Sequence, residues 1–459
     1  MTPQEMLERA LESSTADESV VLVSESSSAN LRWAGNTLTT NGVMQSRDVT
    51  VVSIAHRSNG KAAAVVSGSV ASAEDVEKLV EQADLSARTS EASPDAAPLI
   101  DAGVAQGFSE GPEDTSAEVF SSFAPALGES FARSRAEGRE LFGYAEHEVR
   151  SVYLGNSAGS RLRHIQPTGQ VQLTAKSAQR TRSTWHGAVT RDFADVDMLA
   201  LDATAAQRLK WAERQIDLEP GRYDVVLPPT AVADLMVYAY WSASARDAEE
   251  GRTVYSKPGG GTRVGETLTD KPINLLSDPA YPGLETYPFM ATGESSSFTS
   301  VFDNGLTLER TNWIDSGVLT HLPQTRHSAD LTKMPLTPII DNLIVDVGDG
   351  KGTLDNVVAD VERGLLVTTL WYIREVDPQS LLLTGLTRDG VYLIENGEVV
   401  GAVNNFRFNE SPIDLLKRVT HASETALTLP REWNDFFTRA AMPALRVGDF
   451  NMSTVSQAS

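Results

Sequence analysis

Residues 49–66 read Val-Thr-Val-Val-Ser-Ile-Ala-His-Arg-Ser-Asn-Gly-Lys-Ala-Ala-Ala-Val-Val, two apolar, partly β-branched runs on either side of Asn59-Gly60. An Asn-Gly pair between two such runs is typical of a β-hairpin with a two-residue turn. Asn41-Gly42 lies just upstream, after the short run at residues 38–40. We therefore predict two hairpins, and together with the run at residues 20–23 they indicate a β-sheet near the start of the chain.

A helix signal follows this sheet. Ser72 is a good N-cap residue and Asp75 stands three positions after it. Apolar residues then recur at Val76, Leu79, Val80 and Ala83. This spacing predicts an amphipathic helix that packs on the sheet.

Farther along the chain, composition divides the sequence. Between Arg88 and Arg133 there is no Lys or Arg, and proline and glycine replace the periodic pattern. A second break stands at Glu219-Pro-Gly-Arg222. We predict an α+β fold with an N-terminal α/β domain, a linker, a small central α/β domain and a β-rich C-terminal domain. Their predicted ranges are 1–90, 91–115, 116–218 and 222–455.

Several elements are predicted within the C-terminal range. Residues 223–227 form a buried-strand pattern, and the helix expected at residues 230–247 has one apolar face. Thr353 is predicted to cap a second helix that ends at Gly364. Strand signals follow at residues 365–373 and again at residues 391–400, around Asn396-Gly397.

Composition excludes several functions. The 459 residues include 62 Asp and Glu against 39 Lys and Arg, a net charge of −23, so binding to nucleic acid or to an anionic membrane is not expected. The absence of Cys excludes disulfides, thiolate metal sites and cysteine nucleophiles. No apolar run approaches the ~18 residues of a spanning helix, and the start of the chain does not resemble a signal peptide. We expect a soluble, cytoplasmic protein.

Direct motif reading yields no complete active site. Gly155-Asn-Ser157-Ala-Gly159 has the spacing of a nucleophile elbow, but the residues after it predict a strand rather than the required helix. His321 and His327 are the only near neighbours among the seven His, and Pro323 between them disfavours a shared strand face. His147-Glu148 begins a zincin pattern that Ser151 interrupts.

Other candidates are better explained as structure. The segment at residues 259–265 is predicted to be a flexible loop, because its glycine spacing fits no nucleotide-binding motif. The segment at residues 346–351 is predicted to be a turn rather than a calcium loop. The acidic run at residues 192–197 is predicted to be a solvated loop and a helix start.

The order of short segments over residues 20–447 resembles the TldD/PmbA family. The segments are Asn36-Thr-Leu-Thr-Thr-Asn-Gly42, Val70-Ala-Ser-Ala-Glu-Asp75, Asp303-Asn-Gly305-Leu-Thr-Leu-Glu-Arg310, Ile314-Asp-Ser-Gly317-Val-Leu, Arg326-His-Ser-Ala329, Asp360-Val-Glu-Arg-Gly364-Leu-Leu-Val, Val376-Asp-Pro378 and Tyr392-Leu-Ile-Glu-Asn-Gly397-Glu-Val. Each segment is short, and their shared order makes the resemblance specific.

The resemblance implies a zinc peptidase system whose TldD-type subunit carries His-Glu-x-x-x-His on a helix and a further Cys ligand. The corresponding positions here hold Val237, Tyr238 and Ser242, and the chain has no Cys. We therefore expect a degenerate metallopeptidase helix, with no catalytic, cofactor-binding or metal-binding residue in this chain.

The resemblance thus points to the PmbA (TldE) side of the family, whose members pair with a zinc-bearing TldD-like subunit. It implies a heterodimer, with a homodimer as the other possibility, that acts on unfolded peptides or peptide precursors. A peptide can be held by strand addition. Residues 385–396 and the loop near Gly260 are candidates for this contact, with a purely structural role equally open. Tyr238, Tyr240 and Trp241 either line the vestigial cleft or belong to the core, and helical periodicity favours the core for Trp241.

Two other functions stay open from the sequence. One is an autonomous hydrolase that uses His321 and His327 as atypical ligands or Ser157 as nucleophile. The other is a peptide-binding scaffold that has no protease partner.

Overall fold

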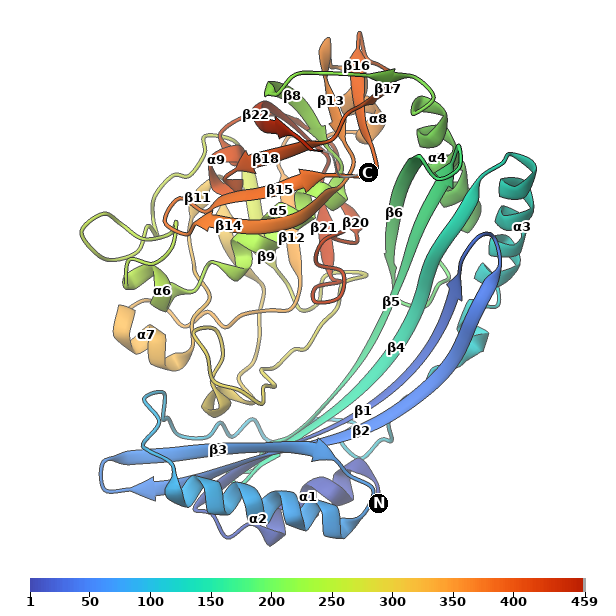
Figure 1. Ribbon diagram of the computed structural model, residues 1–459. Helices are drawn as coiled ribbons and strands as arrows, with labels where there is room; N and C mark the ends of the chain where they lie inside the picture. Colours follow the sequence, from blue (N-terminus) through green and yellow to red (C-terminus); the bar gives the residue numbers. More distant parts are fainter. Residues whose placement is uncertain (457–459) are drawn as a thin grey trace.

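The computed structural model describes residues 1–456 and begins with a long antiparallel sheet. Its six strands have the order β3-β2-β1-β4-β5-β6, and Figure 1 shows them curving along one side of the molecule. The strands are β1 (Glu18–Trp33), β2 (Leu38–Arg57), β3 (Gly60–Ser69), β4 (Glu140–Asn156), β5 (Arg161–Ser177) and β6 (Arg182–Thr190).

Helices cover this sheet near its two ends (Figure 1). At one end α1 (Pro3–Ser13) and α2 (Ala73–Thr89) enclose a core of valines from β1 and β2. At the other end η1 (Ala117–Phe120), α3 (Phe123–Ala136) and α4 (Met198–Trp211) enclose an aromatic-rich core. The predicted cap of α2 is confirmed, because Ser72 and Asp75 form a reciprocal capping box.

The long sheet joins the two predicted N-terminal ranges. β1 pairs with β4 from Val20 opposite Asn156 to Trp33 opposite Gly143, so residues 1–90 and 116–218 contribute to the same sheet. The residues between them run along this sheet: Ala105 N donates to Arg161 O (2.8 Å) and Glu113 N donates to Ser151 Oγ (3.0 Å). The predicted domain boundaries therefore do not coincide with boundaries between sheets, and independent folding of either range stays a prediction.

The C-terminal part contains two further sheets. The larger follows the order β14-β15-β18-β22-β8-β13-β16-β17-β7, with β19 paired to β22, and the smaller follows β11-β10-β9-β12-β21-β20. The strands of the larger sheet are β7 (Gln215–Ile216), β8 (Gly221–Leu227), β13 (Arg363–Val367), β14 (Leu370–Asp377), β15 (Leu382–Thr387), β16 (Val391–Glu395), β17 (Glu398–Val403), β18 (Phe406–Glu410), β19 (Val419–Ala422) and β22 (Leu445–Val455).

The strands of the smaller sheet are β9 (Ile273–Ser277), β10 (Thr311–Asp315), β11 (Val318–Leu319), β12 (Leu343–Val347), β20 (Ala426–Thr428) and β21 (Ala440–Met442). The helices of this part are α5 (Pro229–Trp241), α6 (Ala245–Glu249), η2 (Val301–Asp303), α7 (Arg326–Thr332), α8 (Leu354–Ala359) and α9 (Pro412–Leu416). The largest hydrophobic core of the molecule surrounds α5. The α+β class predicted from the sequence is confirmed.

Two local predictions are wrong. Asn41-Gly42 is not a turn but lies within β2, where it pairs with Leu31 and Asn30 of β1. The turn that joins β1 to β2 comes earlier, at Gly35 and Asn36, which both have positive φ. Gly364 does not cap a helix: α8 ends at Ala359, and Gly364 pairs with Ile394 inside the sheet.

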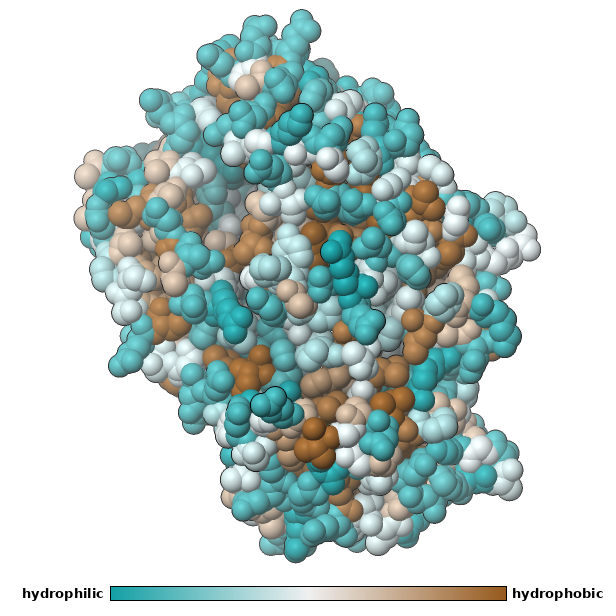
Figure 2. Space-filling view, turned by 180° about the vertical axis from the view of Figure 1, so that it is seen from behind, coloured by the Kyte–Doolittle hydropathy of each residue, from teal (hydrophilic) through white to brown (hydrophobic). Residues whose placement is uncertain are grey.

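The face of the molecule in Figure 2 is mainly hydrophilic, with hydrophobic residues scattered over it in small patches. Within residues 1–456 no helix combines the length and the apolar character needed to cross a bilayer.

Candidate functional site

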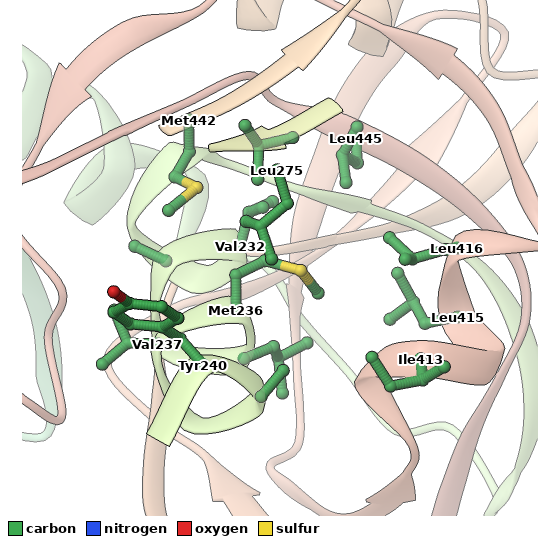
Figure 3. Packing of buried hydrophobic residues seen from close by; sticks show 14 of the residues in the cluster. Val232, Met236, Val237, Tyr240, Leu275, Ile413, Leu415, Leu416, Met442 and Leu445 are labelled. Carbon is green, nitrogen blue, oxygen red and sulfur yellow. The ribbon is translucent and has the colours of Figure 1, made fainter. Parts of the chain in front are cut away.

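Helix α5 carries the positions where the sequence predicts a degenerate metal site. It starts at Pro229 immediately after β8, and proline is suited to a first helical position because its missing N–H has no helical partner there. Figure 3 shows Val232, Met236, Val237 and Tyr240 packed among side chains of other elements, including Leu275, Met442 and Leu416. The prediction of a single apolar face is wrong, because buried residues occur all round this helix.

The three degenerate positions have different environments. Val237 is 0% exposed and belongs to the hydrophobic core. Tyr238 is half-buried, and its ring lies 5.6 Å from the ring of Trp433. Ser242 lies beyond the last residue of α5, where its Oγ donates to Tyr238 O (2.9 Å). Nowhere in residues 1–456 do three or more His, Asp or Glu side chains form a group that could hold a metal ion.

Asp234 is a buried carboxyl group on the same helix that the sequence analysis missed. Its side chain is 0% exposed, and Oδ1 accepts a hydrogen bond from Glu432 N (2.8 Å). Oδ2 has no partner among the described residues. Burial raises the pKa of Asp234 well above its ordinary value. The available signal was a single acidic residue within the otherwise apolar sequence of α5.

Glu432 connects α5 to the edge of the larger sheet. Its carboxylate accepts hydrogen bonds from the backbone N–H groups of Tyr372 and Ile373, each at 3.0 Å. Tyr372 has a positive φ of 53°, and the pairing of β14 with β15 is irregular at this point. This local conformation of β14 therefore directs two consecutive amides at one carboxylate, as an anion-binding turn does.

Aromatic residues surround the C-terminal end of α5. Tyr240 belongs to the core: it is 1% exposed, and its hydroxyl donates to Ile340 O (3.0 Å). Trp241 is half-buried, with its ring 5.3 Å from Trp433 and 6.2 Å from Phe437. Trp241 also lines a cavity of about 290 Å³, so it both packs against the core and faces open space.

This cavity is the first of three that share walls. Tyr287, Asp341 and Phe436 also line a second cavity of about 290 Å³. Gln166, Thr168 and Arg439 then line both the second cavity and a third of about 230 Å³. We call these three cavities the groove. It lies between β5 of the long sheet and the C-terminal part.

The side chains that line the groove change from mainly apolar at one end to charged in the middle. Its first cavity is lined mainly by aromatic and aliphatic side chains, including Trp241, Phe436 and Phe437. Its middle contains two ion pairs, Arg150 with Glu148 (3.0 Å) and Arg439 with Asp341 (2.7 Å). A surface of this kind can contact apolar side chains at one end and polar or charged groups in the middle.

The other sequence candidates do not assemble into a catalytic site. His321 follows β11, where its Nδ1 lies 2.8 Å from Asn312 O, and His327 belongs to helix α7. Ser157 lies in the turn between β4 and β5, and its Oγ accepts from Ser19 N (3.0 Å). The strand that the sequence predicts after this motif is confirmed, because β5 begins at Arg161.

His147 likewise has a structural role. It lies on β4, and its two ring nitrogens contact Thr115 Oγ1 and Arg191 O, each at 2.7 Å. Burial lowers the pKa of His147. Asp197, at the end of the acidic run, is the N-cap of α4, as the sequence predicts.

Residues 220–454 match the family model described as the PmbA/TldA metallopeptidase C-terminal domain. This stretch is more than half of the chain and includes α5, β14 and the loop that carries Glu432. The chain belongs to the PmbA/TldD family. No curated protein matches the sequence.

Solved structures share this fold over nearly the whole chain. TldE from Thermococcus kodakarensis is 17% identical, with a TM-score of 0.78, and the match covers 98% of this chain and 99% of that one. A putative modulator of a DNA gyrase from Thermotoga maritima is 16% identical, with a TM-score of 0.76 and the same coverage. A protein described in the same words from Bacteroides thetaiotaomicron is 14% identical, with a TM-score of 0.74, 99% of this chain covered and 98% of that one.

Proposed function

We propose that this PmbA/TldD-family chain is the subunit of a heteromeric zinc peptidase that does not bind zinc and that helps to hold unfolded peptides or peptide precursors. The observation that carries this proposal is the enclosed packing of α5 around Val237, in a chain that belongs to a metallopeptidase family. The zinc belongs to a TldD-like partner with His-Glu-x-x-x-His. A cytoplasmic location is part of the same proposal.

The side chains at the degenerate positions do not fit zinc. Protein ligands of zinc are imidazole, thiolate or carboxylate groups. Val237 offers a hydrocarbon, and Tyr238 and Ser242 offer neutral hydroxyl groups. Burial and the nearby Glu375 raise the pKa of Tyr238, which keeps the phenol protonated. No catalytic step is therefore assigned to these residues.

Strand β14 is the best-placed element for holding a peptide. It is the edge strand of the larger sheet beside β15, and Tyr372 and Val376 on it are 52% and 58% exposed. An extended peptide can pair with such an edge through backbone groups, without demanding a particular sequence. Tyr238, Trp241 and the groove lie at the neighbouring end of α5 and supply apolar contacts.

This assignment replaces one of the two peptide-contact regions expected from the sequence. Residues 385–396 include the end of β15 and all of β16, and each of these strands already has a hydrogen-bonded neighbour on both sides. They have no free edge for strand addition. A contact between substrate and the loop near Gly260 stays a prediction.

The test measures hydrolysis of an unfolded peptide by this chain alone, by a His-Glu-x-x-x-His paralogue from the same genome, and by the mixture, each with and without a chelator. We expect cleavage to appear or to rise in the mixture and to disappear with the chelator. Cleavage by this chain alone would contradict the proposal. A mixture no more active than the paralogue alone would leave a scaffold without a protease partner as the better description.

A variant of β14 tests the peptide-holding role. Val376→Lys should raise the KM of the mixture for an apolar peptide by about tenfold, because a charge replaces an exposed apolar contact worth ~1.4 kcal/mol. Val65→Lys is the matched control, since Val65 is also a partly exposed valine, on β3. Equal KM values for the two variants would argue against β14.

A further inference from the structure

Two buried arginines lie at helix α4, and they differ in whether a carboxylate neutralises them. Arg139 is 6% exposed and forms ion pairs with Asp202 of α4 (2.6 Å) and with Glu137 (2.7 Å). Arg208, on α4 itself, is 8% exposed and forms no ion pair within residues 1–456. Its guanidinium group makes one hydrogen bond to these residues, from Nη1 to Trp185 O at 3.3 Å. A buried charge without a partner is costly, because burial removes its hydration.

The surroundings of Arg208 do not remove this charge. Burial lowers the pKa of Arg208 to about 10, so the guanidinium group stays protonated at neutral pH. Tyr392 of β16 and the exposed Asp355 of α8 act to raise this pKa, but neither forms an ion pair or a hydrogen bond with the guanidinium group. Arg208 is therefore a buried cation that has no counter-charge in contact with it among the described residues.

Three other polar atoms near Arg208 are buried without a hydrogen-bond partner. They are Thr184 Oγ1 and His186 Nε2 on β6 and the hydroxyl of Tyr392. Thr184 and His186 stand on either side of Trp185, so their side chains point to the same face of β6. Burial is the main cause that lowers the pKa of His186 and raises that of Tyr392, and Arg208 acts on both groups. The Thr184 hydroxyl also acts on Tyr392, although the two hydroxyls do not form a hydrogen bond.

All four side chains can act as hydrogen-bond donors. A guanidinium group donates and cannot accept, and the Thr and Tyr hydroxyls each carry one O–H. His186 is held neutral by burial and by Arg208, and a neutral imidazole can carry its proton on Nε2. A single anion can accept hydrogen bonds from several donors and also supplies the missing negative charge. A water molecule has only two lone pairs and brings no charge.

We propose that a small inorganic anion of the halide class binds at Arg208, between α4, β6 and β16. Thr184 Oγ1, His186 Nε2 and the Tyr392 hydroxyl donate to the same ion. Arg208 is 8% exposed and His186 is half-buried, so a sphere of the size of a water molecule still reaches both residues. The bound ion thus provides the carboxylate's role that Asp202 has for Arg139.

The site lies where the long sheet meets the C-terminal part. Helix α4 packs on β6 and also contacts β17 (Figure 1). An ion held by α4, β6 and β16 therefore joins these two parts of the molecule. The inference does not depend on the proposed peptidase role, because the four side chains do not line the groove.

Crystals of the full chain grown in sodium bromide test the site directly, because bromide replaces chloride and is identified by its anomalous scattering. We expect an anomalous peak in contact with the Arg208 guanidinium group and none at this position in Arg208→Met. An ordered water molecule at this position, or bromide bound only elsewhere, would overturn the proposal.

Thermal unfolding in sodium chloride and in sodium gluconate of equal ionic strength tests the site in solution. The Tm of the wild type should rise with the logarithm of the chloride concentration and should be lower in gluconate, which is too large for the site. Arg208→Met should abolish the difference between the two salts. Arg407→Met is the matched control, since Arg407 of β18 is also half-buried, forms no ion pair within residues 1–456 and donates one 3.3 Å hydrogen bond, to Thr384 Oγ1. This control should keep the difference.

Tyr392→Phe separates hydrogen-bond donation from charge and keeps the ring beside Trp211. In gluconate it removes a buried hydroxyl that has no partner, so its Tm should equal or exceed that of the wild type. In chloride it removes a donor to the ion, so the affinity for chloride should fall by at least about tenfold and the Tm should drop below that of the wild type. Equal Tm changes in the two salts would overturn the proposal, as would a wild type whose Tm is the same in both.

Discussion

Two buried aspartates, Asp84 and Asp234, differ in how completely their carboxyl groups are hydrogen-bonded. Asp84 accepts hydrogen bonds from Thr15 N (2.6 Å), Ser53 Oγ (2.6 Å) and other hydroxyl groups. Burial acts to raise the pKa of Asp84, but these hydrogen bonds outweigh burial and leave the pKa below its ordinary value. Asp234 receives fewer donors, and burial raises its pKa. The charged form is therefore favoured at Asp84 and disfavoured at Asp234.

Asp84→Asn and Asp234→Asn should change the pH dependence of stability in opposite ways. A lowered folded pKa gives stability that is present above the ordinary value of 3.8 and is lost as the pH falls, so Asp84→Asn removes an acid-sensitive contribution. A raised pKa in the folded state gives a contribution to stability that is present below pH 3.8 and is lost as the pH rises. Asp234→Asn should therefore abolish this fall in stability at higher pH.

At neutral pH, Asp84→Asn should cost about 2 kcal/mol of unfolding free energy, because it removes hydrogen bonds to a charged acceptor. Asp234→Asn keeps the acceptor for Glu432 N, so we expect its Tm to match the wild type at about pH 3, below the ordinary pKa of 3.8, and to exceed it increasingly as the pH rises to about 8. Thermal unfolding of all three proteins across this range is the measurement. Parallel curves for Asp234→Asn and the wild type would refute a raised pKa.

At the scale of elements, the sequence predicts a hairpin at Asn41-Gly42 and another at Asn59-Gly60, and only the second is present. Ser58 and Asn59 join β2 to β3, with Gly60 as the first residue of β3, and Asn396 and Gly397, with φ values of 52° and 79°, join β16 to β17. Asn41-Gly42 instead continues β2, because β1 supplies a partner for each of its residues up to the earlier turn at Gly35 and Asn36. A local motif specifies a turn only where the partner strand also ends.

Gly397→Ala and Gly42→Ala should therefore differ. A Cβ at Gly397 lies 2.5 Å from Ala359 O and requires a positive φ, so we expect a loss of about 2 kcal/mol in chemical denaturation. Gly42 has open space around a Cβ and no positive φ, so its alanine variant should change stability by less than about 0.5 kcal/mol. Similar losses of unfolding free energy at both positions would mean that the general effect of replacing glycine by alanine, rather than the turn geometry at Gly397, determines the result.

At the scale of the whole molecule, Arg431 joins the long sheet to the C-terminal part. Its guanidinium lies 5.1 Å from the ring of Trp185 on β6 and 4.5 Å from the ring of Trp371 on β14. It also pairs with Asp389 (3.2 Å), whose side chain is 8% exposed. A planar cation between two aromatic rings depends on shape as well as on charge.

Arg431→Lys should consequently destabilise the protein by about 1–3 kcal/mol although the charge is kept, because an ammonium group cannot stack on both rings. Arg9→Lys is the control: Arg9 forms an exposed ion pair with Glu77, so its loss should be close to zero. Urea denaturation of both variants measures the difference. An Arg431→Lys variant as stable as the wild type would show that the positive charge alone, without stacking on the two rings, stabilises the contact between the long sheet and the C-terminal part.

The features that could be predicted from the sequence are those that depend on adjacent residues, whereas contacts between distant segments could not be predicted. The cap at Ser72, the strands on both sides of Asn396-Gly397 and the strand before α5 follow from adjacent residues and are confirmed. The pairing of β1 with β4 joins residues that are far apart in the sequence, and no adjacent residue encodes it. The hydrogen bond from Glu432 N to Asp234 Oδ1 also joins residues that are far apart in the sequence, so composition and spacing could not reveal it.

Hydrophobic cores pack on the long sheet near both of its ends, while the middle of β1 is the polar stretch Ser24-Glu-Ser-Ser-Ser28. Apart from its backbone pairing with β2 and β4, the middle of β1 makes polar rather than apolar side-chain contacts, such as Thr115 N donating to Ser27 Oγ. Opening of one end therefore need not break the packing of the other. In native-state hydrogen exchange, amides of the same strand should then fall into separate protection classes, with the weakest protection between residues 24 and 28.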